Sequence, residues 1–180
     1  MSNVVLIGMP GCGKSTLGVL LAKAMGMAFV DTDLVLQLRY GEKLQTLLCE
    51  KGVDAFLKLE EETVCALQVE NAVIATGGSV IYGTRAVERL KAEGCLVYLK
   101  TSLAVIENRV RNLSTRGVAL RQGQTLEDLY RERTPLYERA CDLCFEERGE
   151  RMENDAEALR TLLEDKGFQP QANWREGKRR

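Results

Sequence analysis

A short segment near the N-terminus constrains this chain more than any other feature of its sequence. Residues 8–16 read GMPGCGKST and match the pattern G-x-x-x-x-G-K-[ST]. An apolar run at residues 4–7 precedes the segment, and a helical pattern opens at Ser15. This strand, loop and helix order is the context in which the motif forms a phosphate-binding loop, or P-loop.

The residue types in this loop suit a triphosphate. Glycines let backbone amides turn towards a phosphate without Cβ clashes, and the helix N-terminus adds unpaired N–H groups and a positive dipole end. We expect Lys14 to bridge the β- and γ-phosphates of ATP, and the Ser15 hydroxyl to bind Mg²⁺. The predicted nucleotide-binding residues of the loop are Gly11, Cys12, Gly13, Lys14, Ser15 and Thr16. The alternative is a glycine-rich turn that merely precedes a helix.

Short apolar runs alternate with amphipathic stretches along the rest of the chain. The runs lie at residues 4–7, 28–30, 72–75, 96–99 and 143–145. After the first helix, helical patterns lie at residues 33–39, 44–51, 53–68, 84–93, 102–112, 125–139 and 154–165. Continuous apolar runs are typical of strands buried on both faces of a parallel sheet. The sequence therefore predicts an α/β, three-layer P-loop NTPase fold, with a five-stranded parallel sheet flanked by helices.

Two segments lack a helical or strand pattern. Residues 112–124 are polar and contain Gly117 and Gly123, which predicts a mobile loop over or near the site. Residues 169–180 are polar and end in three basic residues, which predicts a disordered tail. We therefore expect a single P-loop domain over residues 1–168.

Composition excludes several function classes. The 25 Lys and Arg residues balance 26 Asp and Glu residues, so we expect neither a nucleic-acid nor a membrane partner. No apolar run approaches the ~18 residues of a membrane span, and no signal peptide is evident, so the prediction is a cytoplasmic protein, compatible with a monomer. The chain has no histidine, so proton transfer must use Asp, Glu, Lys or water. The C-x-x-C pair of Cys141 and Cys144 has no companion pair, which favours strand packing over a zinc site.

Acidic residues follow the second apolar run. P-loop enzymes place an Asp at the end of a second strand to hold the metal shell. The run 72–75 is followed by TGGS, with no acid, whereas Asp31 and Asp33 follow the run 28–30. The carboxyl ends of strands are where α/β sheets bind ligands. The alternative makes Asp31 or Thr32 the N-cap of the next helix.

Together these features resemble the shikimate kinase family over about residues 3–166. The shared pieces, in the family's order, are the P-loop, DTD at 31–33, Phe56 with Glu60 and Glu61, TGG at 76–78, the loop arginine Arg116, and RTPLYE at 133–138. The last piece looks like the family's specific R-x-P-L-Y motif. The resemblance implies a nucleoside-monophosphate-kinase-like fold, with one kinase domain over residues 1–168 and a mobile lid at about residues 112–124. It also implies transfer of the γ-phosphoryl group of ATP, with Mg²⁺, to a hydroxyl of shikimate in aromatic amino-acid biosynthesis.

The resemblance also implies a role for each matching residue on the nucleotide side. Arg109 would pack against adenine. Arg116 would move in with the lid towards the transferring phosphoryl group, which makes it nucleotide-binding and, together with Lys14 and Asp33, catalytic. Asp31 would belong to the water shell of the metal that Ser15 binds.

On the acceptor side, the resemblance implies four substrate-binding residues. Asp33 would orient and deprotonate the substrate hydroxyl. Gly77 and Gly78 would let backbone amides approach the substrate, and Arg133 would pair with its carboxylate.

The sequence departs from the family at three places. Leu57 stands where shikimate kinases carry an arginine, so Arg133 would hold a carboxylate largely alone. Ser79 replaces a usual third glycine and would reshape the pocket floor. Arg116 is followed by GVAL rather than a proline-containing sequence, so Arg121 is an alternative lid arginine.

These departures leave two other functions open. One is a kinase acting on another small hydroxylated acceptor, and the other is a nucleotide-binding relative with little catalysis. A nucleoside monophosphate kinase is possible on fold grounds alone, but the motif at residues 133–137 argues against it.

Overall fold

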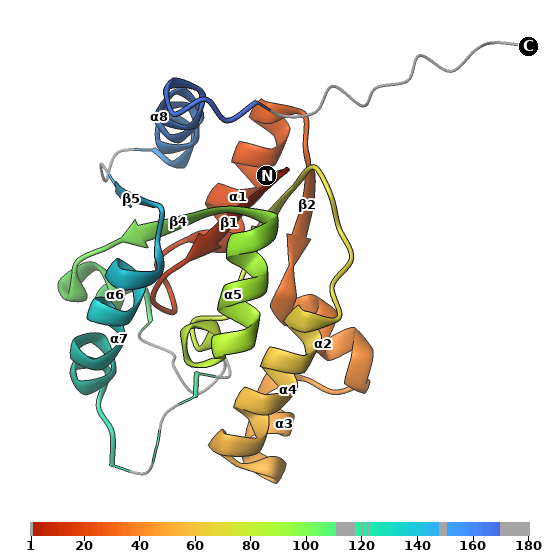
Figure 1. The fold of residues 1–180 in the computed structure, drawn as a ribbon. Coiled ribbons are helices and arrows are strands. Elements are labelled where there is room, and N and C mark those ends of the chain that lie inside the picture. The colour runs from red at the N-terminus through yellow and green to blue at the C-terminus, as the bar shows by residue number, and fades with distance from the viewer. Residues whose placement is uncertain (1, 111–117, 120, 122, 148–150, 170–180) are drawn as a thin grey trace, which may run out of the picture.

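The computed structural model describes residues 2–110, 118, 119, 121, 123–147 and 151–169. Within this part of the chain, a five-stranded parallel sheet has the strand order β2-β3-β1-β4-β5 (Figure 1). The strands are β1 (Asn3–Ile7), β2 (Ala28–Asp31), β3 (Ala72–Ala75), β4 (Gly94–Lys100) and β5 (Leu143–Glu146). All five predicted runs therefore form strands, and the predicted fold class is confirmed.

Helices connect the strands and cover both faces of the sheet. They are α1 (Lys14–Met25), α2 (Thr32–Tyr40), α3 (Leu44–Lys51), α4 (Val53–Cys65), α5 (Thr84–Glu93), α6 (Leu103–Arg109), α7 (Leu126–Ala140) and α8 (Met152–Asp165). The chain passes through α1 in one direction along the sheet and through α5 in the other. Because such crossovers are right-handed, α1 and α5 lie on opposite faces, and α8 packs against α1 (Figure 1).

Several details of the helices differ from the prediction; for example, α8 begins at Met152 rather than at residue 154, and α6 ends at Arg109. Helix α4 ends at Cys65 rather than at residue 68. Its last turn is closed by hydrogen bonds from the Ala66 N–H to the carbonyl oxygens of Glu62 and Thr63. A short 3-10 helix, η1 (Val80–Tyr82), was not predicted, because three residues are too few to show periodicity. Residues 111 and 112 of the predicted helix 102–112 lie outside the described residues.

Two hydrophobic clusters stabilise the fold. The larger one surrounds the sheet, and strands β1 and β3 are buried along their whole length. The smaller one joins Leu36, Leu47 and Phe56, from α2, α3 and α4, to Ala119. Ala119 belongs to the segment predicted as a lid, so this cluster attaches the described part of that segment to the helices beyond β2.

Much of the predicted lid and tail lies outside the described residues. Within the range 112–124, the structure describes Val118, Ala119, Arg121, Gly123 and Gln124, and the chain after residue 169 is not described. None of the helices in the described ranges combines the length and the apolar character that a membrane crossing needs.

Candidate active site

The loop between β1 and α1 approaches its neighbours so closely that side chains are excluded. Gly11 has φ +80°, and a Cβ atom there would lie 2.3 Å from Cγ2 of Val110. Gly13 has φ +91° and forms the N-cap of α1. Both backbone conformations are in the left-handed region that favours glycine. The loop therefore presents main-chain groups at the N-terminus of α1, as a phosphate requires.

Lys14 folds back over this loop. Its side chain is buried, and Nζ donates to the carbonyl oxygens of Gly8 at 2.8 Å and Met9 at 2.9 Å. These carbonyl partners are neutral, and no carboxylate of the described residues lies within ion-pair distance of the ammonium group. A cation enclosed by a phosphate-binding loop fits the triphosphate of ATP.

Ser15 and Asp31 bring the ends of the first two strands together. The Ser15 hydroxyl donates to Oδ2 of Asp31 at 2.7 Å. Oδ1 of the same carboxylate accepts from the Asp33 N–H at 3.0 Å, so Asp31 is the N-cap of α2. The N-cap interpretation is thus confirmed, and it leaves the other carboxylate oxygen facing the P-loop serine.

Ser15 and Asp31 together fit a magnesium ion that keeps water and phosphate ligands, rather than a metal whose ligands all come from the protein. No cluster of three or more His, Cys, Asp or Glu side chains that could hold a metal occurs in the described ranges. Mg²⁺ normally keeps several waters and binds one or two protein oxygens together with substrate phosphates. The hydroxyl of Ser15 and the carboxylate of Asp31 supply that donor set.

Two acidic side chains face the cavity beside the P-loop with altered titration. Burial raises the pKa of Asp33 to about 6; the charge of Asp31 adds to the rise, and Lys14 opposes it. Burial raises the pKa of Glu60 to about 7; Ser79 opposes the rise, and Asp33 adds to it. Glu60 is 3% exposed, and its Oε1 atom has no hydrogen-bond partner among the described residues.

Glu60 was not among the predicted site residues. It lies one turn after Phe56 on α4, and both side chains are buried. The sequence did hold a signal for it. Glu60 lies on the same helix face as Phe56, and an acid on the apolar face of a helix is a candidate for a buried, functional side chain.

The glycines after β3 form the floor of the cavity. The Gly77 N–H donates to Oγ1 of Thr32 at 3.1 Å, so this amide is already engaged. A Cβ atom on Gly77 would lie 2.0 Å from Oε1 of Glu60, and one on Gly78 would lie 3.2 Å from Nη1 of Arg133. In this structure Gly77 therefore contributes space for neighbouring side chains rather than a free amide.

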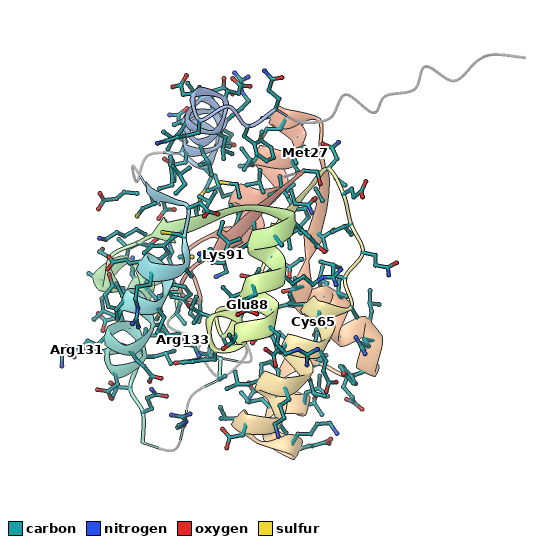
Figure 2. The ribbon with its side chains drawn as sticks, viewed as in Figure 1. Met27, Cys65, Glu88, Lys91, Arg131 and Arg133 are labelled. Atoms are coloured by element: carbon teal, nitrogen blue, oxygen red, sulfur yellow. The ribbon has the colours of Figure 1, made fainter. Side chains whose placement is uncertain are left out.

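Arg133 is a buried cation with neutral partners. Arg133 is 1% exposed to solvent. Nε donates to the Tyr82 hydroxyl at 3.3 Å and Nη2 to the Ala119 carbonyl at 3.2 Å, and the guanidinium group lies 5.0 Å from the Tyr82 ring centre. Figure 2 shows Arg133 directed into the molecule, whereas Arg131 on the same helix extends outwards.

No carboxylate lies within ion-pair distance of Arg133 in the described ranges. Glu60 is near enough to interact electrostatically with Arg133, but no carboxylate of the described residues contacts the guanidinium group, and a buried charge without a contacting partner is costly. The arrangement is therefore well suited to an anionic ligand.

One cavity of about 270 Å³ joins these groups. Its lining includes Gly11, Gly13, Lys14, Ser15, Thr16, Asp33, Glu60, Gly77, Gly78, Ser79 and Arg133. Most predicted site residues therefore meet at one place, where the strands β1, β2 and β3 end.

The other predicted residues that the structure describes, Cys12, Asp31 and Arg109, do not line this cavity. Cys12 is buried within the loop and does not line the cavity. Arg109 lies beside the P-loop, where its Nη1 atom forms an ion pair with Glu147 at 2.9 Å. Arg116 lies outside the described residues. Leu57 lines a smaller adjoining cavity together with Arg121.

Comparisons with known proteins agree with this geometry. A sequence model of the family described as "Shikimate kinase" matches residues 10–164. The chain is 36% identical over 175 residues to the shikimate kinase of Paracidovorax citrulli, covering 93% of this chain and 95% of that protein. It is 34% identical over 162 residues to the shikimate kinase of Thermodesulfovibrio yellowstonii, covering 88% and 93%.

Solved structures are similar as well. The shikimate kinase of Acinetobacter baumannii in complex with shikimate aligns with a TM-score of 0.86 and 27% identity, covering 94% of this chain and 96% of that one. The shikimate kinase of Aquifex aeolicus aligns with a TM-score of 0.79 and 28% identity, covering 92% and 98%.

Proposed function

The chain belongs to the shikimate kinase family, and from that premise we propose that it transfers the γ-phosphoryl group of ATP to a hydroxyl of shikimate. One observation carries the proposal for this chain. A single cavity connects the P-loop lysine, Lys14, to the acid Asp33 and to the buried cation Arg133. An acceptor that has both a hydroxyl and a carboxylate fits these three groups.

On the nucleotide side, the chain's own residues bind and orient the triphosphate. The amides at the start of α1 and the ammonium group of Lys14 hold the phosphates. Ser15 and Asp31 would hold Mg²⁺, which when bound neutralises charge on the phosphate oxygens. Arg109 borders the loop, and we propose that it packs against the adenine base.

On the acceptor side, Asp33 accepts a hydrogen bond from the substrate hydroxyl. As the hydroxyl oxygen forms its bond to the γ-phosphorus, the bond from that phosphorus to the β,γ-bridging oxygen breaks and ADP leaves. The hydroxyl proton passes to the Asp33 carboxylate. The raised pKa of Asp33 brings it nearer to working pH, which makes it a better base than an exposed aspartate.

Arg133 binds the acceptor's carboxylate and fixes which hydroxyl faces Asp33. Because catalysis of phosphoryl transfer depends on alignment and charge neutralisation, this anchoring contributes to rate as well as to affinity. Arg116 remains our proposal for the lid arginine that approaches the transferring phosphoryl group.

Leu57 favours a second candidate, a kinase for another small hydroxylated acid. An apolar residue at this position removes one positive charge that the family carries on the acceptor side, which suits an acceptor with less negative charge. The burial of Arg133 without a contacting carboxylate among the described residues still favours an acceptor that carries an anionic group. We further propose an enzyme without a nucleic-acid or membrane partner, which the near-neutral charge balance supports. A cytoplasmic location and a monomeric state remain part of this proposal.

The test is a screen of purified protein with ATP, Mg²⁺ and a panel of small hydroxy acids and polyols that includes shikimate. Phosphorus NMR and mass spectrometry identify the product. We expect a phosphate monoester of shikimate. Phosphorylation of another panel member, with none of shikimate, would favour the second candidate, and binding of ATP without any product would favour a non-catalytic relative.

A further inference from the structure

The acceptor side of the main cavity is short of positive charge. Its described lining holds the carboxyl groups of Asp33 and Glu60 but one guanidinium group, that of Arg133. Lys14 is engaged by the P-loop carbonyls on the phosphate side. A carboxylate brought in by the acceptor adds a third acidic group near a single buried cation. Like charges at such a site weaken binding unless another cation is near.

A second, smaller cavity of about 10 Å³ adjoins the first, and the two share Ala119 and Arg133 in their walls. Leu57 and Arg121 both line this smaller cavity. A space of this size holds at most about one water molecule, so Leu57 and Arg121 lie close to Arg133. Among the described residues that line either cavity, Arg121 is the one cation besides Lys14 and Arg133.

The charge of Arg121 is not neutralised by the acid nearest to it in this cavity. Glu132 accepts from the Tyr82 hydroxyl at 2.7 Å and from Nε2 of Gln124 at 2.8 Å. No ion pair joins the Arg121 side chain to any acid in the part of the chain that the structure describes. Its guanidinium group is therefore available to a ligand.

The backbone holds Arg121 beside Arg133. The Arg121 N–H donates to Oε1 of Gln124 at 3.2 Å. Two residues earlier, the Ala119 carbonyl accepts from Nη2 of Arg133 at 3.2 Å. Because two residues span at most about 7 Å, the Arg121 backbone lies near the Arg133 guanidinium.

A chain of side-chain hydrogen bonds adds to this connection. Gln124 bonds to Glu132, Glu132 accepts from Tyr82, and Tyr82 accepts from Nε of Arg133. The position of residue 121 is thus tied to the cation that binds the acceptor.

We propose that Arg121 supplies the second positive charge for the acceptor's carboxylate, at the place where Leu57 offers none. The inference rests on the proposed function and names a specificity-determining residue for it. It also assigns Arg121 to the acceptor's carboxylate rather than to the transferring phosphoryl group.

The experiment compares the wild type with R121Q, R121K, L57R and the double variant R121Q/L57R. The KM values for shikimate and for ATP are measured separately, and the neutral methyl ester of shikimate serves as a matched acceptor. The loss of one charge-assisted hydrogen bond lowers the affinity for the ligand by about 10- to 100-fold. We expect R121Q to raise the KM for shikimate by that factor, with the KM for ATP and the reaction of the ester nearly unchanged. R121K should raise the KM for shikimate by less than R121Q does. The added L57R substitution should restore the affinity of R121Q for shikimate.

The matched control is R131Q, since Arg131 is exposed on α7 and pairs with Glu127 on the same helix. A KM for shikimate that is unchanged in R121Q would overturn the inference. So would a raised KM for ATP, or an equal penalty for the methyl ester, because either result assigns Arg121 to the nucleotide. Absence of shikimate turnover in the wild type would instead overturn the proposed function, and with it this inference.

Discussion

Gly77 and Glu60 approach each other so closely that the cavity floor tolerates no side chain. A Cβ atom on Gly77 would lie 2.0 Å from Oε1 of Glu60 and 2.8 Å from Oδ1 of Asp33. Residue 77 therefore controls where two acidic side chains of the acceptor site can lie. The same Glu60 oxygen has no hydrogen-bond partner among the described residues, and Glu60 lines the cavity.

Gly77→Ala should impair the acceptor site and spare the nucleotide site. Forcing a methyl group into a packed site costs roughly 1–3 kcal/mol, which corresponds to about 10- to 100-fold in affinity. We expect kcat/KM for shikimate to fall by at least this factor, because Asp33 is displaced as well. Isothermal titration with ATP should give nearly the wild-type affinity.

Gly167→Ala is the matched control. Gly167 has φ +82° with open space around it, after the end of α8, so alanine adds backbone strain of about 1 kcal/mol without a clash. Its kinetic constants should equal those of the wild type. Equal kinetic losses in both variants would show that the effect of Gly77→Ala is a general loss of stability.

Glu60 should make the protein less stable as the pH rises. Its folded pKa of about 7 lies above the ordinary value of 4.5, so the folded state binds more protons than the unfolded state between these values. The free energy of unfolding therefore falls as the pH rises from about 4.5 to about 7, by on the order of 3 kcal/mol from this group. Below pH 4.5 this penalty is absent.

Urea unfolding of the wild type and Glu60→Gln at pH 5 and pH 8 measures this effect. The free energy of unfolding of Glu60→Gln minus that of the wild type should be larger at pH 8 than at pH 5. Glu62→Gln, at an exposed position of the same helix, is the control and should show no such change. A stability difference between Glu60→Gln and the wild type that is the same at both pH values would contradict the assignment.

Asp33→Asn should remove the proton acceptor and leave the fold intact. General-base catalysis contributes about 10²- to 10⁴-fold, so kcat should fall by that factor while the affinity for ATP is kept. Asp54→Asn, at an exposed position in the first turn of α4, should behave as the wild type. A kcat within about threefold of the wild type would exclude Asp33 as the base.

Arg109→Ala should weaken nucleotide binding without changing the acceptor site. Stacking of a cation on an aromatic ring contributes about 0.5–2 kcal/mol, so we expect the KM for ATP to rise by about 2- to 30-fold. The KM for shikimate should not change. If Arg109 serves only its ion pair with Glu147, Glu147→Gln and Arg109→Ala will lower stability alike and leave the KM for ATP unchanged.

The nucleotide half of the site could be predicted from local sequence because its residues are adjacent in the chain. The P-loop lies between one strand and one helix, and Asp31 needs only the end of the next strand to reach Ser15. Strands buried on both faces also leave a plain signal, so the five runs and their parallel arrangement followed from the apolar pattern alone.

The acceptor half could not be predicted in the same way because its contacts are long-range. Tyr82 lies in a short 3-10 helix and contacts Arg133 from a distant part of the chain. Ala119 packs in a cluster with Leu36 and Phe56, and no periodic pattern in the sequence around Ala119 indicates this contact. The engagement of the Gly77 amide by Thr32 likewise depends on how two strand ends are placed.

Shikimate-dependent formation of ADP by the purified protein, with ATP and Mg²⁺, tests the central claim most directly. The account predicts that each ADP formed is matched by one phosphorylated shikimate, and that Lys14→Ala abolishes both products. Tight binding of ATP with no ADP formed at any shikimate concentration would contradict it.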